Sequence, residues 1–329
     1  MVYNDNNIKF ILGNLKGNLA FQNSKILITG GSGLVGNALT NLLRINKFKN
    51  VFSVRSKDCN LINLQEVKRL MKSVKPDYVF HLAARVHGLG GNSKYKSDIL
   101  FENTLINTHL IEESRKIGVK KIVAMGSGCV YPELNNEELF ERDIFNGSPH
   151  SSEDSYAHSK RLMLAHLNAA REQYGLASAF VISGNLYGPH DSFNIEDGHV
   201  IPSLIAKFHR AKLNSQAVKV WGSGIAIRDF THAIDMASAL LTIMINFEGE
   251  INAGSGFRHK IKDIVDCLKK HTNVKVEWDK EKPDGQLVRF YNLDKLFSIG
   301  FNPKISLEKG VIETYEWYEK NYDSGLIRN

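Results

Sequence analysis

The segment KILITGGSGLVGNALTNLL, residues 25–43, decides the fold of this chain. A short apolar run is followed by a turn that contains Gly30, Gly33 and Gly36, and then by a stretch with helical periodicity. Glycines at three-residue spacing between a strand and a helix permit a tight turn and let bare backbone approach a phosphate group at the helix N-terminus. The segment therefore predicts a strand, a glycine turn and a helix that bind the pyrophosphate of a dinucleotide.

The alternation of strand and helix continues to residue 189. PDYVFHLAA, residues 76–84, is almost continuously apolar, which is typical of a parallel strand buried on both faces. LINLQEVKRLMKSV, residues 61–74, has the apolar spacing of an amphipathic helix. This pattern predicts an α/β fold with a doubly wound, Rossmann-like parallel sheet. Further strands are expected at 50–56, 120–127 and 176–189, and further helices at 99–117 and 155–174.

The second half of the chain is less regular and predicts a smaller C-terminal substrate lobe. Such a lobe would cover the carboxyl edge of the sheet, where ligands bind in open α/β folds. Its helices are expected at 200–212, 235–247 and 307–322, and its short strands at 217–224 and 273–278. The domains expected are an N-terminal extension at 1–24, an NADP-binding domain at 25–185 with a returning segment near 228–253, and a mainly substrate-binding lobe at 186–329.

The composition narrows the classes of function. The chain has 329 residues, a net charge of +7 and a pI of about 9.1. No apolar run approaches the roughly 20 residues that cross a bilayer, and the N-terminus lacks a secretory signal, so we expect no membrane partner. Cys59, Cys129 and Cys267 lie far apart, which indicates a reducing cytoplasm without a clustered metal site. Because no basic stripe carries interleaved aromatics, the charge favours a phosphorylated small molecule over nucleic acid.

The end of the second strand indicates which dinucleotide binds. Most NAD enzymes place an acidic residue there to bind the ribose hydroxyls. This chain has Arg55 and Lys57 instead, with Ser32 in the glycine turn. Cations favour a 2′-phosphate, so we expect NADPH rather than NADH, although both cations could also be solvated surface residues. Asn60 and Leu61 follow and are expected to cap the adenine.

The segment SYAHSK carries a tyrosine and a lysine four residues apart, Tyr156 and Lys160. That spacing puts them on one face of a helix. A cation beside a phenol favours the phenolate and lowers the pKa of the phenol, and such a tyrosine can exchange a proton with a carbonyl or an alcohol. Ser127, at the end of the preceding strand, can hydrogen-bond the same oxygen. The three residues predict a site for carbonyl reduction.

VAMGSGCVYP, residues 123–132, places Cys129 two residues after Ser127. A free cysteine is most often a small buried hydrophobic residue. Alternatively, Cys129 and Ser127 face one substrate and have different roles. Nothing in this stretch alone decides between the two.

Together these motifs make the chain similar to the extended short-chain dehydrogenase/reductase superfamily, and within it to the GDP-L-fucose synthase branch, the GDP-4-keto-6-deoxymannose epimerase-reductases. The resemblance covers about residues 25–322. It rests on the stretches KPDYVFHLAARV, GSGCVYP, SYAHSK, NLYGPHDSFNIEDGHVIPSLIAKFHRAK, VWGSG with RDF, and KPDG.

The resemblance implies a reaction. NADPH reduces a ketone at carbon 4 of the GDP-linked sugar, and Tyr156 protonates the product with help from Ser127 and Lys160. Cys129 as base and His199 as acid epimerise carbon 3, carbon 5 or both. It also implies a homodimer formed through the helices near 99–117 and 155–174. The implied cofactor contacts are Gly30, Ser32, Gly33, Leu34, Gly36, Arg55, Lys57, Asn60, Leu61, Leu82, Ala83, Ala84, Tyr156, Lys160, Asn185, Leu186 and His199, and the implied substrate contacts are Ser127, Cys129, Asn185, Val200, Lys207, Trp221 and Arg228.

Several positions depart from the family pattern and leave alternatives open. A carbon-4 reductase without epimerase activity could act on another GDP-4-keto-6-deoxy sugar, such as a heptose. A 4,6-dehydratase is disfavoured, because no acidic pair follows Ser127. A protein that only senses NADPH is disfavoured by the presence of Ser127, Tyr156 and Lys160. The departures are Gly128, Ser183, Gly184, Ala233, Ile234 and His87, and we expect them around the sugar and the nicotinamide.

Overall fold

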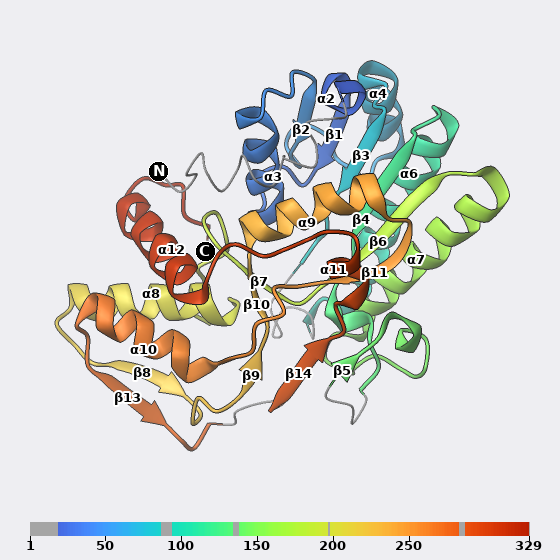
Figure 1. Ribbon diagram of the computed structural model, residues 1–329. Helices are drawn as coiled ribbons and strands as arrows, with labels where there is room; N and C mark the ends of the chain where they lie inside the picture. The colour runs from blue at the N-terminus through green and yellow to red at the C-terminus, as the bar shows by residue number, and fades with distance from the viewer. Residues whose placement is uncertain (1–18, 87–93, 134–137, 197, 283–286, 329) are drawn as a thin grey trace.

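The computed structural model describes residues 19–86, 94–133, 138–196, 198–282 and 287–328 (Figure 1). Its centre is a six-stranded sheet with the strand order β11-β6-β4-β3-β1-β2, in which every neighbouring pair is parallel. The predicted α/β fold with a Rossmann-like parallel sheet is confirmed. The strands are β1 (Ile26–Thr29), β2 (Val51–Val54), β3 (Tyr78–His81), β4 (Lys121–Met125), β6 (Ala177–Ser183) and β11 (Gly249–Ala253).

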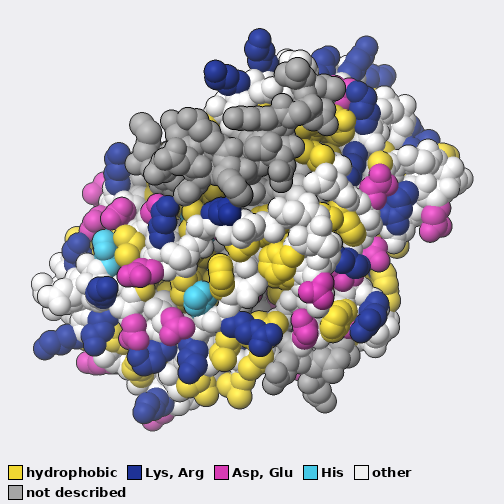
Figure 2. Space-filling view, in the orientation of Figure 1, with side chains coloured by type: hydrophobic (Ala, Val, Ile, Leu, Met, Phe, Trp, Pro, Cys, Tyr) yellow, Lys and Arg dark blue, Asp and Glu magenta, His cyan; other side chains and the backbone are white. Residues whose placement is uncertain are grey.

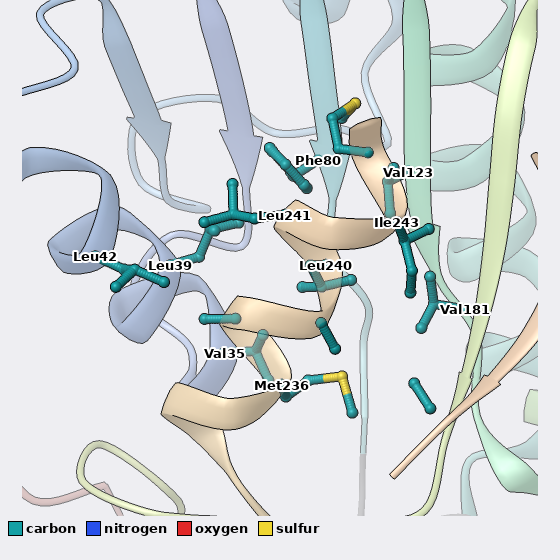
Figure 3. Close-up of a cluster of buried hydrophobic side chains, with 14 of the residues drawn as sticks. Val35, Leu39, Leu42, Phe80, Val123, Val181, Met236, Leu240, Leu241 and Ile243 are labelled. Carbon is teal, nitrogen blue, oxygen red and sulfur yellow. The ribbon is translucent and has the colours of Figure 1, made fainter. Parts of the chain in front are cut away.

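Helices cover both faces of this sheet (Figure 1). α3 (Leu34–Ile45) and α9 (Ala233–Asn246) bury their apolar side chains against one face. Figure 3 shows this packing, with side chains of the two helices directed at Phe80, Val123 and Val181 of the strands. The opposite face is covered by α4 (Leu64–Val74), α6 (Lys96–Lys116) and α7 (Asp154–Tyr174).

The strand sequences explain why two cores form. Side chains alternate between the faces of a strand. Ile26 and Ile28 therefore join the core under α3 and α9, whereas Leu27 between them joins the other core. All three are fully buried. A continuously apolar strand is thus what a sheet covered on both faces requires.

The chain leaves the central sheet at Gly184. β6 ends at Ser183, and β7 (Asn185–Tyr187) pairs in parallel with β10 (Phe230–His232) instead. This two-stranded sheet lies at the carboxyl edge of β6. From β10 the chain returns through α9 to β11, which pairs with β6 from Gly249↔Ala179 to Ala253↔Ser183.

The C-terminal lobe is built around a third core. α8 (Val200–Leu213), α10 (Ile261–Thr272) and α12 (Leu307–Asn321) enclose it, next to the parallel pair β8 (Val218–Trp221) and β13 (Val276–Asp279). A four-stranded sheet lies between the lobe and the central sheet, in the order β12-β9-β14-β5. Its strands are β12 (His259–Lys260), β9 (Ile227–Arg228), β14 (Val288–Tyr291) and β5 (Glu138–Leu139).

The remaining elements are short. They are α2 (Leu19–Asn23), α11 (Asp294–Ser298) and the 3₁₀ helices η1 (Gly128–Val130) and η2 (Glu141–Asp143). In the described part of the predicted N-terminal extension, Phe21 packs edge-on against Phe48 and Tyr78. No helix among the described residues is long and apolar enough to cross a membrane. Figure 2 shows lysine and arginine interspersed with acidic side chains, and numerous over the C-terminal lobe.

Candidate active site

The glycine turn packs backbone against backbone. Gly30 has a φ of +71°, and a Cβ atom there would lie 2.8 Å from the Ala83 nitrogen. A Cβ atom at Gly36 would overlap the carbonyl oxygen of Gly30. The Gly33 N–H donates to that same oxygen at 3.0 Å. The turn therefore requires glycine for conformation at Gly30 and for space at Gly36.

The helix after this turn offers an anion site. Gly33 is the N-cap of α3, and no side chain caps the helix there. The first N–H groups of a helix lack intrahelical acceptors and favour negative charge. Leu34 opens the helix and packs on the core below, while Ser32 is exposed in the turn. These residues fit the pyrophosphate of a dinucleotide.

The predicted cations of the second strand differ in their surroundings. The Arg55 guanidinium makes a bidentate ion pair with Asp58, with Nε–Oδ2 at 2.7 Å and Nη2–Oδ1 at 2.9 Å. The hydrogen bonds from Arg55 lower the pKa of Asp58 to about 2. Lys57 is exposed. Arg55 can therefore bind a 2′-phosphate in two ways. Either its guanidinium contacts the phosphate and Asp58 together, or the ion pair with Asp58 breaks.

The expected adenine contacts are held by backbone hydrogen bonds. The Asn60 N–H donates to a carboxylate oxygen of Glu66 at 2.8 Å, and the Asn60 side-chain oxygen accepts from Ile62 N–H at 3.1 Å. The Leu61 side chain is 8% exposed and belongs to the core between the sheet and α4. Asn60 itself is exposed. Of the two, Asn60 is thus the side chain available to a base.

A buried polar chain follows the end of β3. Thr29 Oγ1 lies 2.9 Å from His81 Nδ1, and His81 Nε2 lies 3.0 Å from Asn107 Oδ1. Burial and, second to it, the charge of Lys160 lower the pKa of His81 to about 3, so the ring is neutral. The Ala83 N–H donates to Thr29 Oγ1 at 3.3 Å. This series of hydrogen bonds fixes the half-buried residues Leu82, Ala83 and Ala84 beside the glycine turn.

The strand β4 ends in the turn that carries Ser127 and Cys129. Ser127 caps η1, and its Oγ accepts a hydrogen bond from the Cys129 N–H at 3.4 Å. Cys129 is 7% exposed and packs in one small cluster with Tyr156, Ala157 and Ile99, against which Ala84 also packs. The structure thereby brings together a predicted base, a predicted proton donor and a predicted cofactor contact.

Tyr156 and Lys160 lie one turn apart near the start of α7 and are 9% and 2% exposed. Lys160 Nζ donates to the Met125 carbonyl at 2.8 Å and lies 5.6 Å from the centre of the Tyr156 ring. Burial lowers the pKa of Lys160 to about 8, a shift that the charge on Cys129 opposes.

The expectation that the cation lowers the pKa of the tyrosine is wrong for this structure. Burial raises the pKa of Tyr156 instead, and the negative charges on Cys129 and Glu153 raise it further. Desolvation disfavours the charged phenolate relative to the neutral phenol. Tyr156 is therefore protonated at neutral pH, which is the form that can donate a proton.

His199 lies on a separate element from this cluster. It is exposed and is the N-cap residue of α8, followed by Val200, which is 40% exposed. Its neighbour Asp191 is 4% exposed, and its Oδ2 has no hydrogen-bond partner. Burial raises the pKa of Asp191 to about 6, and the positive charge of His199 opposes the shift. The charges of Asp191 and His199 therefore interact.

The expected nucleotide contacts lie further into the lobe. Trp221 is 58% exposed, and two ammonium groups lie beside its ring, Lys207 at 4.8 Å and Lys282 at 5.8 Å from the ring centre. Arg228 is on β9, with Nη1 donating to the Ile227 carbonyl at 2.8 Å. An exposed indole can stack on a base, and the neighbouring cations can bind phosphates.

The remaining predicted residues lie at the end of β6, on β7 and at the start of α9. Asn185 is exposed, and its Nδ2 donates to the Asp229 carbonyl at 3.3 Å, whereas Leu186 packs partly into the core. Ser183, Ala233 and Ile234 are 7%, 2% and 7% exposed. Since Ala233 and Ile234 are buried in the start of α9, these two departures bear on packing rather than on a ligand. His87 lies outside the described residues.

Two residues near the site were missed from the sequence. Arg161 follows Lys160, is 8% exposed, and its Nε donates to the Val130 carbonyl at 2.8 Å. Its charge interacts with that of Cys129. Tyr291, from the distant strand β14, lies against both Gly128 and Gly184. The position of Arg161 after Lys160 could have indicated its role, whereas no local signal indicates Tyr291.

Comparison with known proteins agrees with this geometry. Residues 26–254 match the NAD dependent epimerase/dehydratase family. The chain belongs to this family. GDP-L-fucose synthase 1 from Arabidopsis thaliana is 33% identical to it over 315 residues, which are 94% of this chain and 98% of the relative. The predicted likeness to the GDP-L-fucose synthase branch of the extended short-chain dehydrogenases/reductases is thereby confirmed.

Two solved structures are similar over most of the chain. A GDP-L-fucose synthetase from Naegleria fowleri superposes with a TM-score of 0.86 at 30% identity and covers 94% of this chain and 95% of its own. A GDP-mannoheptose C4 reductase from Campylobacter jejuni with NADP bound gives a TM-score of 0.81 at 29% identity, with 91% and 99% covered. The family members that resemble this chain thus differ in the sugar that their names give.

Proposed function

We propose that this protein is an NADPH-dependent reductase of the carbon-4 ketone of a GDP-4-keto-6-deoxy sugar. We further propose that it epimerises carbon 3, carbon 5 or both, as in the GDP-L-fucose synthases it resembles. The observation that carries the proposal is the buried cluster of Cys129 and Tyr156 at the carboxyl edge of the sheet, with Lys160 one turn away. The cofactor is NADPH, which accords with the NADP bound in the Campylobacter reductase.

The reduction needs a group that protonates the new alcohol and a cation that stabilises the anion left on that group. When bound, NADPH supplies the hydride for carbon 4. Tyr156, which burial keeps protonated by raising its pKa, gives its proton to the oxygen that becomes the alcohol. Ser127 hydrogen-bonds the same oxygen, and Lys160, held by the Met125 carbonyl, stabilises the phenolate that remains. The uncapped N-terminus of α3 binds the pyrophosphate.

The epimerisation needs a proton carrier on each face of the sugar. The ketone acidifies the hydrogens on carbons 3 and 5. Cys129 is the base. Burial lowers the pKa of two nearby cations, Lys160 and Arg161, and a negative charge on the Cys129 sulfur raises it. His199 is the acid, at an exposed position next to buried Asp191.

The GDP moiety is bound in the C-terminal lobe. Trp221 stacks on guanine beside Val200, and Lys207 and Arg228 bind the diphosphate. On this basis residues 25–185 with 228–253 form the NADP-binding domain, and 186–329 form mainly the GDP-sugar lobe. The chain is cytoplasmic, since its three cysteines are free thiols.

The protein is further proposed to be a homodimer through α6 and α7. These helices contact each other, and Leu100 (40%), Phe101 (61%) and Leu162 (45%) on them are exposed. A second copy that buries these side chains against its own α6 and α7 would form a two-fold four-helix interface.

A second candidate is a carbon-4 reductase without epimerase activity that acts on a heptose. The name of the Campylobacter relative favours it. So does Gly128, which stands beside Cys129 where the family usually has a serine. A base works only if its geometry is kept, and this turn is where the geometry differs.

The deciding experiment follows NADPH oxidation with GDP-4-keto-6-deoxymannose in deuterated water. Oxidation with deuterium at carbon 3 or carbon 5 of the product supports the epimerase-reductase, and Cys129→Ser should then retain NADPH binding but lose exchange. Oxidation without deuterium selects the plain reductase. No oxidation of NADPH with either this sugar or its heptose analogue would refute both. Tyr156→Phe is the control for reduction and should lower kcat by about 10²-fold or more.

A further inference from the structure

Two glycines of the site leave space for one tyrosine. A Cβ atom at Gly128 would overlap the Tyr291 hydroxyl oxygen and lie 2.8 Å from Cζ and 3.2 Å from Cε1. A Cβ atom at Gly184 would lie 2.8 Å from Cε2 and 3.4 Å from Cδ2 of the same ring. The ring thus lies between the ends of β4 and β6, with one edge on each glycine.

Space, rather than backbone conformation, explains these glycines. Neither Gly128 nor Gly184 has a positive φ angle. Gly128 is the middle residue of the turn between Ser127 and Cys129, and Gly184 directly precedes Asn185. All three of these flanking residues are among the substrate contacts that the family resemblance implies. Tyr291 is therefore placed where a substrate must lie.

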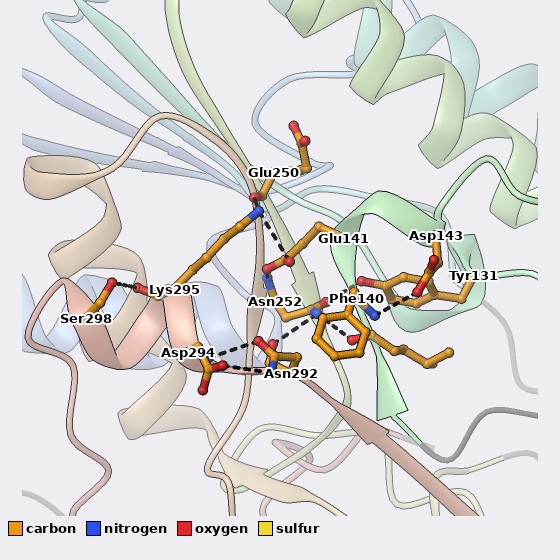
Figure 4. Close-up of polar contacts among 11 residues, drawn as sticks. Tyr131, Phe140, Glu141, Asp143, Glu250, Asn252, Asn292, Asp294, Lys295 and Ser298 are labelled. Atoms are coloured by element: carbon orange, nitrogen blue, oxygen red, sulfur yellow. Dashed lines mark hydrogen bonds and ion pairs between the residues drawn. The ribbon is translucent and has the colours of Figure 1, made fainter.

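The strand that carries Tyr291 is firmly anchored. β14 pairs with β5 at Tyr291↔Leu139, and the next residue, Asn292, donates its N–H to the Leu139 carbonyl at 2.9 Å. Figure 4 shows Asn252 beside this point, donating to the carbonyls of Leu139 at 3.0 Å and Asn292 at 3.1 Å. The Tyr131 ring packs on the Tyr291 ring with centres 5.9 Å apart. The phenol is thus held in position, not free to swing away.

We propose that Tyr291 is a specificity-determining residue that forms one wall of the sugar subsite, an inference that rests on the proposed function. Its ring is half-buried, so part of it remains open to a ligand. The ring fills volume that side chains at positions 128 and 184 would otherwise occupy. Its hydroxyl brings a hydrogen-bonding group to the Ser127–Cys129 turn. The ring and the hydroxyl of Tyr291 together determine which sugars bind, according to the positions of their hydroxyl groups and the length of their carbon chain.

The same strand couples the two ends of the substrate. β14 pairs with β9 at Val288↔Ile227 and Arg289↔Arg228, next to the proposed diphosphate contact. Its other end holds Tyr291 against the catalytic turn. A GDP-sugar bound along β14 would therefore meet Arg228 with its phosphates and Tyr291 with its sugar. In this arrangement β14 lies along the bound GDP-sugar from its phosphates to its sugar.

The test compares two substrates on three proteins. GDP-4-keto-6-deoxymannose and the corresponding heptose are offered to wild type, Tyr291→Phe and Tyr291→Leu, and kcat/KM is measured for each. We expect Tyr291→Leu to change the ratio of the two values by about tenfold or more, because one hydrogen bond and the shape of a wall are lost. Tyr291→Phe should account for the share due to the hydroxyl. NADPH affinity should stay unchanged in both.

A residue with only a structural role should affect stability and not the ratio of the two kcat/KM values, and Tyr131 serves as this comparison. Tyr131→Phe removes a neighbouring buried hydroxyl that donates to Asn252 Oδ1 at 2.5 Å, so it should lower Tm without changing the ratio. Gly128→Ser should lose activity through its clash with the Tyr291 hydroxyl, and Tyr291→Leu in the same chain should restore it. If both Tyr291 variants keep the wild-type ratio, the inference is wrong and the reductase assignment stands. If wild type oxidises NADPH with neither sugar, both fall.

Discussion

Asp58 is the residue that sets how well Arg55 can serve a 2′-phosphate. The carboxylate holds the guanidinium in a bidentate pair at 2.7 and 2.9 Å. A phosphate must compete for the same donors. The ion pair is exposed and contributes little to stability, so its main effect is on the cofactor.

We predict opposite effects for the two partners of this pair. Asp58→Asn should raise the preference for NADPH over NADH, measured as the ratio of kcat/KM values, because Arg55 is released to the phosphate. Arg55→Ala should lower the ratio by about tenfold, the size of one charge-assisted hydrogen bond. Arg210→Ala, an exposed arginine on α8, removes the same charge and should leave the ratio unchanged. Equal ratios in all four proteins would show that Arg55 does not bind the phosphate.

Residues whose role depends on local sequence could be predicted. The need for glycine at positions 30 and 36 follows from a strand, a turn and a helix that are adjacent in the chain, and the clashes at both positions agree with it. The upward direction of the pKa shift at Tyr156 could not be predicted, because it comes from burial, which is a property of the whole fold. The contact of Tyr291 with Gly128 joins distant segments for the same reason.

At the scale of elements, one buried cation joins β4 to α9. Lys121 is 7% exposed, and its Nζ donates to the Ile243 carbonyl at 3.0 Å. Burial lowers the pKa of Lys121 to about 8 from 10.5. The unfolded chain therefore binds more protons than the folded one between these values, and folding stability rises with pH across that window. Below pH 8 the full penalty of the buried charge is present.

Lys121→Met should remove this penalty. The variant keeps the length of the side chain, and we expect it to be about 1–2 kcal/mol more stable than wild type at pH 7. The difference should shrink as the pH rises from 8 to 10.5. Urea unfolding at several pH values measures it, and comparison of the two proteins cancels the titration of all other groups. A difference that is independent of pH would mean that Lys121 has the same pKa in the folded and in the unfolded chain.

Elements with strong periodicity were predictable, and short or irregular ones were not. The strand expected at 176–189 is two strands in different sheets, since Gly184 separates β6 from β7. α10 was missed, although Ile261, Ile264, Val265 and Leu268 have helical spacing. The sheet β12-β9-β14-β5 has strands of two to four residues, which are too short to show alternation.

At the scale of the molecule, one buried asparagine links the central sheet to the C-terminal lobe. Asn252 is fully buried on β11, and its N–H donates to a Glu141 carboxylate oxygen at 2.9 Å. Its side chain donates to β5 and to Asn292 after β14, and accepts from Tyr131 (Figure 4). Lys295 of α11 pairs with Glu141 at 3.3 Å. The connection explains how β14 is held at the edge of the sheet.

The overall architecture followed from the sequence because the βαβ pattern leaves few topologies open. The way in which the lobe joins the sheet did not. It depends on single polar side chains such as Asn252, whose neighbours in space come from three distant segments. Binary patterns of apolar and polar residues carry no information about such contacts. The part of the site that faces the sugar is built at this junction, and it was accordingly the least predictable.

Replacement of Asn252 by leucine should weaken the junction and with it the site. Leu139, Asn292 and Tyr131 would each lose a hydrogen bond inside the protein, so we expect a loss of about 3 kcal/mol or more in the free energy of unfolding. Where the fold persists, KM for the keto-sugar should rise while the Kd for NADPH stays the same, because β14 carries Tyr291 and the cofactor contacts lie on other strands. Asn50→Ala removes a hydrogen bond of 2.9 Å at an exposed position and serves as the control, with a loss below about 1 kcal/mol. Urea unfolding and steady-state kinetics measure both effects, and an unchanged KM in a destabilised Asn252→Leu protein would show that β14 is anchored without this residue.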